Sequence, residues 1–185
     1  MFLSSKNDHF KFDFPRNFIP QSIVDKYKPV LNKMPGSMIK EPIDAFNYGI
    51  QSLNLPGPSF DPVSQLDAPG YERSFRSSEP TQRLYQKDLT VTMQSFDGFF
   101  NYWMALELFE YYYGLGGDKP WIPEGAGIQL FDGEGNVFVN VQMKEMLFIG
   151  ISGLDLNFSN NTVEFNTFDL NFKYNILEIK YGYKA

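Results

Sequence analysis

The sequence predicts a mainly β fold, a β-barrel or β-sandwich of antiparallel strands with long hairpins, plus one packed α-helix at about 98–113 and an N-terminal arm. Several segments alternate apolar and polar residues, which is typical of strands with one wet face. Turn-forming Gly and Asn residues separate these segments. Only one long segment is apolar at helical spacing, so a single main helix is expected.

Composition limits the functions that this fold can carry. The 185 residues favour one domain, and the net charge of −6 disfavours a protein that grips nucleic acid. The absence of Cys excludes disulfides and thiol chemistry, and a single His excludes a multi-histidine metal site. The 19 Phe, 11 Tyr and 2 Trp exceed what one core is expected to absorb, which indicates that some rings lie at subunit contacts.

Residues 1–36 are expected to form a basic N-terminal arm, and residues 37–185 an acidic domain. The arm is expected to dock on its own domain or on a neighbour, although a solvated terminal segment is the simpler alternative. Phe10, Phe12 and Phe14 alternate with polar residues and predict a strand. A short helix capped by Ser22 should follow and end before Pro29.

The middle of the chain predicts two strands on either side of a loop. Residues 38–55 are expected to form a strand with a bend at Pro42, and residues 58–80 a long functional loop without regular structure. The second strand covers residues 84–96. The helix then begins after Asp97 as N-cap and ends before Gly114, and its apolar residues on all sides indicate burial on more than one side.

The C-terminal third predicts two hairpins. Shifts of the apolar face near 150–153 and 166–167 predict β-bulges in the longer one. Their strands are expected at 128–131 and 137–141, joined by Asp132–Asn136, and at 147–158 and 163–174, joined by Asn160–Asn161.

Motifs of known chemistry are weak in this sequence. The segment Asp132–Asn136 lacks the ligand spacing of a calcium loop, so a turn is favoured. The pair Glu107 and Glu110 indicates solvated surface rather than acid–base chemistry. The aromatic runs at 99–103 and 111–113 could stack on a sugar or a base, but their helical spacing favours packing. No enzyme activity, cofactor or metal is expected.

Four segments carry a resemblance to a known family. They are Arg83–Thr92, Asp97–Trp103, Leu130–Gly133 and Thr167–Asn175. Together with the order of the predicted elements, they make residues 40–180 resemble the tail tube protein of contractile-tailed bacteriophages. That family is similar to the tube proteins of type VI secretion and of contractile injection particles.

The resemblance implies a structural virion protein. Family members form hexameric rings in which strands from six subunits close one β-barrel, and the rings stack into a hollow tube through which DNA passes. The implied partners are other copies of the chain, the tail sheath, the baseplate or tube initiator, the tail terminator, and DNA as a cargo that does not adhere. The implied location is the phage tail, assembled in the host cytoplasm, and no membrane insertion is expected because no apolar run is long enough.

Two sets of residues are candidates for this function. Wet-face residues of the predicted strands are expected to face the lumen, where low positive charge would keep DNA from sticking: Thr90, Thr92, Asp155, Asn157, Asp169 and Asn171. Aromatic residues of the arm and the loop are expected at contacts between subunits: Phe10, Phe12, Phe14, Tyr27, Tyr71 and Phe75. The alternative is a monomeric β-sandwich module that binds carbohydrate through exposed aromatic residues.

Overall fold

The computed structural model describes residues 10–33, 39–55, 57, 63–66, 70, 72–75, 87–114, 121–122, 124–154 and 166–182. In these residues the chain is mainly β, as predicted. Its strands are β1 (Phe10–Asp13), β2 (Ile50–Asn54), β3 (Val63–Leu66), β4 (Glu72–Phe75), β5 (Asp88–Gln94), β6 (Trp121–Ile122), β7 (Ala126–Phe131), β8 (Val137–Ile151) and β9 (Thr167–Tyr181). Its helices are α1 (Gln21–Leu31), α2 (Pro42–Gly49) and α3 (Phe100–Gly114), with short 3₁₀ turns η1 (Arg16–Phe18) and η3 (Asp97–Phe99).

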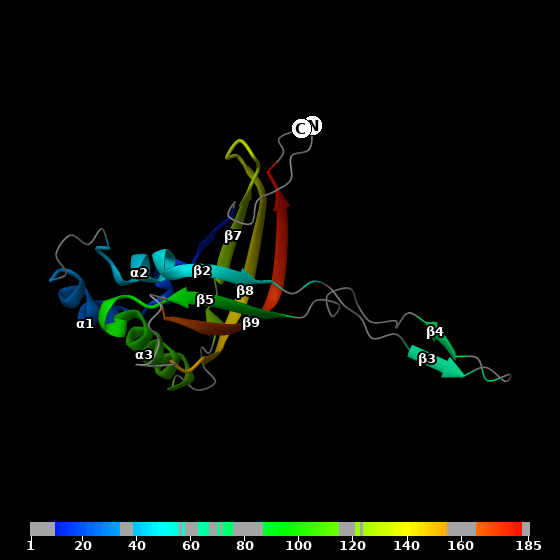
Figure 1. Ribbon diagram of the computed structural model, residues 1–185, viewed down its shortest axis with the longest axis horizontal. Helices are drawn as coiled ribbons and strands as arrows, with labels where there is room; N and C mark the ends of the chain where they lie inside the picture. The colour runs from blue at the N-terminus through cyan, green and yellow to red at the C-terminus, as the bar shows by residue number, and fades with distance from the viewer. Residues whose placement is uncertain are drawn as a thin grey trace, which may run out of the picture.

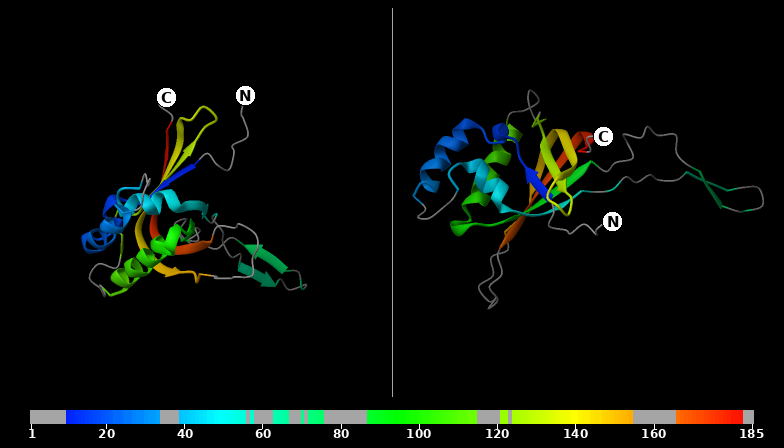
Figure 2. Two further views of the ribbon diagram at one scale, coloured as in Figure 1. Left: turned by 60° about the vertical axis from the view of Figure 1, so that its left-hand side comes forward. Right: turned by 90° about the horizontal axis from the view of Figure 1, so that it is seen from above.

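Six antiparallel strands curl into a nearly closed barrel in the order β1-β7-β8-β9-β5-β2, and β6 pairs with β8. The helices gather on one side of this sheet, and the upper parts of β7, β8 and β9 extend beyond them (Figures 1 and 2). One face of the sheet packs on the helices, where rings meet closely: the Phe148 and Phe172 centroids are 4.8 Å apart, and those of Phe109 and Phe148 are 5.3 Å apart. The opposite face is polar.

Residues 10–31 belong to the same folded body as the rest of the chain. The strand predicted around Phe12 forms, and it pairs with β7 along its whole length. Phe12, Phe14, Phe18 and Leu31 are all buried in the core. The structure therefore does not separate residues 10–33 from the barrel as an arm.

Helix α1 runs through Pro29, where the sequence predicted its end. Proline disfavours the helical conformation of the residue before it, but burial of one helix face opposes that preference. Ile23, Tyr27 and Leu31 are buried along that face. Packing of these side chains therefore decides where the helix ends.

The prediction of one strand over 38–55 is wrong in its first part. Residues 42–49 form α2, and only Ile50–Asn54 is a strand. Pro42 occupies the first helical position, where its missing N–H costs nothing, and the Glu41 N–H donates to Asp44 Oδ2 at 3.3 Å. This capping pattern, rather than a bend in a strand, explains the proline.

The expectation of a loop without regular structure over 58–80 is also wrong in part. Strands β3 and β4 pair antiparallel, with Val63 opposite Phe75 and Leu66 opposite Glu72. This hairpin lies well apart from the barrel (Figure 1). A two-stranded hairpin is marginally stable by itself, so a projecting one calls for a partner surface.

The predicted helix is present as α3, two residues later than expected because η3 precedes it. Its N-terminal region is held by Asn101, which is fully buried. The Asn101 side chain donates to the Gln94 carbonyl at 2.7 Å and accepts from the Phe96 N–H at 3.0 Å. Phe100, Met104, Ala105 and Leu108 of α3 are buried, so helix packing explains these apolar residues, as predicted.

Strands β8 and β9 are each 15 residues long and replace the shorter segments predicted at 137–141, 147–158 and 163–174. The short hairpin of β7 and β8 around Asp132 is confirmed, and so is an irregularity near Gly150, because the register shifts between Phe148 and Gly150. The turn predicted at 160–161 and the strand residues 155–158 lie outside the described residues.

The core face of the long hairpin changes parity once in β9 and twice in β8. In β8 the buried residues are Val139, Val141 and Met143, and then Met146 and Phe148. Glu145, with a φ of 52°, lies at the first change. The second change in β8 is the irregularity between Phe148 and Gly150, after which Ile151 lies opposite the buried Leu170. In β9 the core positions pass from Tyr174 to Leu177, the partner of Met143. This change lies several residues from the one predicted near 166–167.

Gly125, which precedes β7, provides a stringent test of this packing. Its φ is +63°, and a Cβ there would lie 1.5 Å from the Met143 carbonyl oxygen. We expect Gly125→Ala to lower the free energy of unfolding by about 3 kcal/mol or more. The alanine would be strained at this positive φ, and the backbone around Met143 would also have to shift to make room for its Cβ. Gly135→Ala is the matched control because Gly135 also has a positive φ, +86°, but no neighbour within 4 Å. Equal losses of stability in urea unfolding would contradict the close approach.

Candidate channel face and assembly surfaces

Four of the six predicted lumen residues lie together on the polar face of the sheet. β5 and β9 pair so that Thr90 is opposite Asn171 and Thr92 is opposite Asp169. The Thr90 hydroxyl donates to Asn171 Oδ1 at 3.0 Å, and the Thr92 hydroxyl donates to Asp169 Oδ1 at 2.8 Å. We call these four residues the threonine patch. Asp155 and Asn157, the other two, lie outside the described residues.

The polar face continues across β1, β7, β8 and β9. One row across these strands consists of Lys11, Gln129, Asn140 and Lys180, which are consecutive partners in the strand register. We call the polar face of these four strands the mixed-charge stretch. Its charges are neutralised locally by ion pairs: Lys11 with Asp13 at 2.8 Å and Lys144 with Glu178 at 2.7 Å. Sequence reasoning missed this stretch because the row is assembled only by the register of four strands.

Lys144 also affects the ionisation of its partner. Its ammonium group donates to Glu178, and this hydrogen bond together with its positive charge lowers the pKa of the Glu178 carboxyl. Glu178 therefore stays ionised over the physiological pH range. The mixed-charge stretch thus carries both signs of charge at close spacing, while the threonine patch carries hydroxyls, an amide and one carboxylate.

Three of the predicted subunit contacts lie inside this chain instead. Phe12, Phe14 and Tyr27 are buried in its own core. Phe10 is partly buried at the end of β1. Phe75 is placed by its backbone in β4, and Tyr71 lies outside the described residues.

Tyr27 instead joins α1 to α3. Its hydroxyl donates to Glu107 Oε1 at 2.9 Å, and the Lys26 ammonium pairs with the same oxygen at 2.5 Å. Burial, followed by the bond to Glu107, raises the pKa of the Tyr27 phenol far above its ordinary value. Tyr112 forms a similar contact, donating to the Phe18 carbonyl at 2.8 Å, and burial raises its pKa to about 12. These phenols stabilise the helix layer.

Large apolar side chains are exposed at several places in the described residues, and two of these places bear on assembly. On α3 they are Trp103 and Tyr113, the ring face that sequence analysis assigned to packing. On the last part of β9 they are Ile179 and Tyr181, which are 44% and 70% exposed although they lie on the core side, opposite Val141 and Val139. Such exposure on the core side of a sheet makes the end of β9 a candidate interaction surface.

Other candidate chemistry is weak in the described part of the chain. No group of three or more metal-ligating side chains occurs there. The Asp132 carboxylate accepts the N–H groups of Glu134 and Asn136, which lowers its pKa and explains the turn without a metal. No helix among these residues is long and apolar enough to cross a membrane.

Comparison with known proteins concerns the fold of this chain. No protein-family model and no curated protein matches the sequence. Solved structures do match over nearly the whole chain. A chain of the anti-feeding prophage baseplate has a TM-score of 0.56 at 12% identity, covering 97% of this chain and 97% of that one. The chain has a tail-tube-like fold.

Two further structures match the chain in fold, one from a tube-terminating cap and one from a sheath–tube complex. A chain of the tube-terminating cap of the anti-feeding prophage matches with a TM-score of 0.53 and 11% identity, over 98% of this chain and 94% of that one. A chain of the sheath–tube complex of an extracellular contractile injection system matches with 0.53 and 9%, over 96% and 92%. At these identities the likeness concerns the fold.

Proposed function

We propose that this protein is a structural subunit of the inner tube of a contractile tail or injection particle, and that its copies form hexameric rings that stack into a hollow tube. The observation that carries the proposal is the tail-tube-like fold over nearly the whole chain. The exposed core-side residues of β9 and the projecting hairpin support it, since both call for a neighbouring chain. No catalytic role is assigned to any residue.

The polar face of the sheet is the proposed wall of the channel. Its threonine patch offers one carboxylate and no cation, and in the mixed-charge stretch the lysines are paired with carboxylates. DNA would find few free cations to bind there and would pass without adhering. Asp155 and Asn157 are included in this proposal as further channel residues.

The hairpin of β3 and β4 is the proposed contact between stacked rings. It projects from the barrel and would gain stability by packing on the next ring (Figure 2). Partners beyond the tube would be the sheath around it, the baseplate or initiator at one end, and the terminator at the other. Assembled in the host cytoplasm, the tube would then belong to the virion.

Electron microscopy of the purified protein over a range of high concentrations tests the proposal. A tube subunit should give stacked rings, seen as hollow filaments of constant width. A terminating cap, which one of the similar structures contains, should give single rings that do not stack. A particle that sediments as a monomer at every concentration and binds a glycan array would overturn the proposal in favour of the carbohydrate-binding module.

A further inference from the structure

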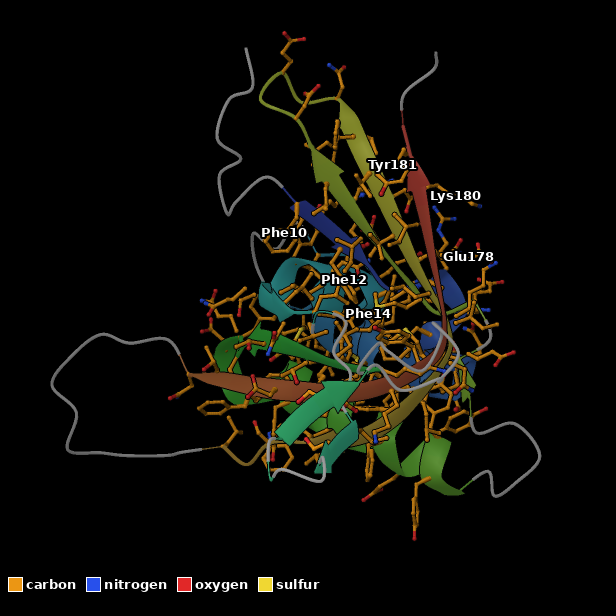
Figure 3. All side chains as sticks on the ribbon, turned by 90° about the vertical axis from the view of Figure 1, so that its right-hand side faces the viewer. Phe10, Phe12, Phe14, Glu178, Lys180 and Tyr181 are labelled. Carbon is orange, nitrogen blue, oxygen red and sulfur yellow. The ribbon has the colours of Figure 1, made fainter. Side chains whose placement is uncertain are left out.

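Among the residues that the structure describes, two strand edges are left free at opposite ends of one four-stranded part of the sheet. The order β1-β7-β8-β9 ends at β1 on one side. On the other side, β9 pairs with β5 only through residues 167–173. Among the described residues, Asn175–Tyr181 therefore has β8 on one side and no strand on the other. Figure 3 shows Phe10 and Phe12 on one outer strand and Glu178, Lys180 and Tyr181 on the other.

The geometry points to a joint between two copies of this chain, in which β1 of one copy pairs antiparallel with Asn175–Tyr181 of β9 of the next. This inference rests on the proposed self-assembly and names the edges that carry it. Free edges are templates for pairing with another chain. Since the two edges differ, each copy offers one of each, and such a head-to-tail contact closes into a ring when the rotation allows.

The direction of the strands follows from the sheet. Each neighbouring pair from β1 to β9 is antiparallel, so β1 and β9 run in opposite directions. A rotation about an axis roughly along the strands keeps the direction of each strand. The β1 strand of the next copy therefore runs antiparallel to β9, and the two edges can form the ordinary antiparallel ladder.

The core sides of the two edges also match. A groove of about 720 Å³ lies beside β1, between that strand and the α2–β2 segment, with Phe10, Phe12, Tyr48 and Ile50 in its lining. A strand laid on β1 would place its core-side residues there. On β9 those residues are Leu177, Ile179 and Tyr181, and the last two are the exposed apolar side chains that this chain leaves uncovered.

Charges on the polar side select one register. With Lys11 opposite Glu178, Phe10 lies opposite Ile179 and Phe12 opposite Leu177, so all apolar residues share one face. Moving the register by two residues places Lys11 opposite Lys180 and Asp13 opposite Glu178, which sets like charges against each other. In the favoured register, Glu178 lies between Lys144 of its own chain and Lys11 of the next.

Disulfide trapping tests this joint cleanly because the chain has no cysteine. Directly opposed residues in an antiparallel pair have Cα atoms about 5 Å apart, within the range of a disulfide. Within one chain, Lys11 and Glu178 are separated by three strand spacings, about 14 Å, so they cannot bond to each other. The double variant Lys11→Cys/Glu178→Cys can therefore be trapped only between copies.

We expect the oxidised double variant to give a ladder of covalent oligomers on a non-reducing gel, ending at the number of subunits in the ring. Each single variant should stop at traces of dimer. The control Asp97→Cys/Glu110→Cys, at two exposed positions away from both edges, should give no ladder. The same samples are imaged by electron microscopy before oxidation.

The outcomes separate the joint from the proposed function. Rings or tubes without a ladder, from this pair and from Lys11→Cys/Lys180→Cys, would overturn the joint while leaving the tube proposal intact. A ladder only from Lys11→Cys/Lys180→Cys would support pairing of these two edges but overturn the register that places Lys11 opposite Glu178. A ladder without stacked rings would support the joint but count against a tube, and neither ladder nor rings would overturn both.

Discussion

A protein lacking residues 1–36 should fail to fold. The deletion removes β1, η1 and α1 and with them seven buried apolar side chains of the core: Phe12, Phe14, Phe18, Ile19, Ile23, Tyr27 and Leu31. Each loss of a large core side chain costs about 2–5 kcal/mol, whereas the whole stability of a domain is about 5–15 kcal/mol. Circular dichroism should show the absence of a cooperative thermal transition.

A single substitution measures the same effect without unfolding the protein. Phe18 is fully buried, and its ring lies 4.4 Å from that of Phe14 and 6.2 Å from that of Phe172. We expect Phe18→Ala to cost about 3–5 kcal/mol and to lower Tm by roughly 6–20 °C. Lys28→Ala, at an exposed position of α1, is the control and should change Tm little. For the deletion of residues 1–36, a cooperative thermal transition near the wild-type Tm would contradict the prediction and show that residues 10–31 are dispensable for folding.

Sequence patterns correctly predicted the elements whose structure is determined by their own local sequence. Alternation placed β1 and β5, turn residues placed the hairpin of β7 and β8, and helical spacing placed α3. The sequence did not predict α2, because its short apolar run is compatible with strand or helix and a capping pattern decides between them. The length of β8 and β9 was also missed, since a change of parity within a strand interrupts the alternation on which such predictions depend.

The candidate surfaces were predictable only where both strands of a pair show the same alternation of polar and apolar residues. The threonine patch was found because β5 and β9 each display a clean wet face. The mixed-charge stretch and the free edges were not, because they depend on which strands become neighbours and where each pairing stops. Burial likewise depends on tertiary packing, so Phe12 and Phe14 were expected at subunit contacts although they complete the core of their own chain.

The large number of aromatic residues is explained partly by this core. Four rings contact one another in pairs that connect the residue after β1 with η1, α2 and β9: Phe14, Phe18, Phe46 and Phe172. The helices on the core side thus bury many aromatic rings that the sheet alone would leave exposed. Among the described residues, the exposed aromatic side chains include those on α3 and at the end of β9, which are available for contacts between copies.

Reversing one charge in the threonine patch should make the proposed channel bind DNA. Asp169→Lys replaces a carboxylate with an ammonium group at each copy around a ring, and stacked rings repeat it along the tube. A protein surface that contacts six phosphates loses about 10³-fold in DNA affinity between 50 and 200 mM salt, because condensed counterions are released on binding. We therefore expect Asp169→Lys tubes to retain fluorescent single-stranded DNA when sedimented at 50 mM salt and to release it at 200 mM, while wild-type tubes retain little at either.

Two variants separate the position of the charge from the change of charge itself. Asp169→Asn removes the negative charge but keeps an oxygen that can accept from the Thr92 hydroxyl, so its tubes should behave like wild type. Asp97→Lys makes the same reversal at an exposed residue of η3, away from the threonine patch, and should bind DNA only on surfaces open to solvent, where added nuclease removes it. DNA held by Asp169→Lys tubes should resist nuclease because the channel excludes the enzyme. If that DNA is digested as fast as DNA on Asp97→Lys tubes, the threonine patch faces outward and the channel wall must be sought on another face of the subunit.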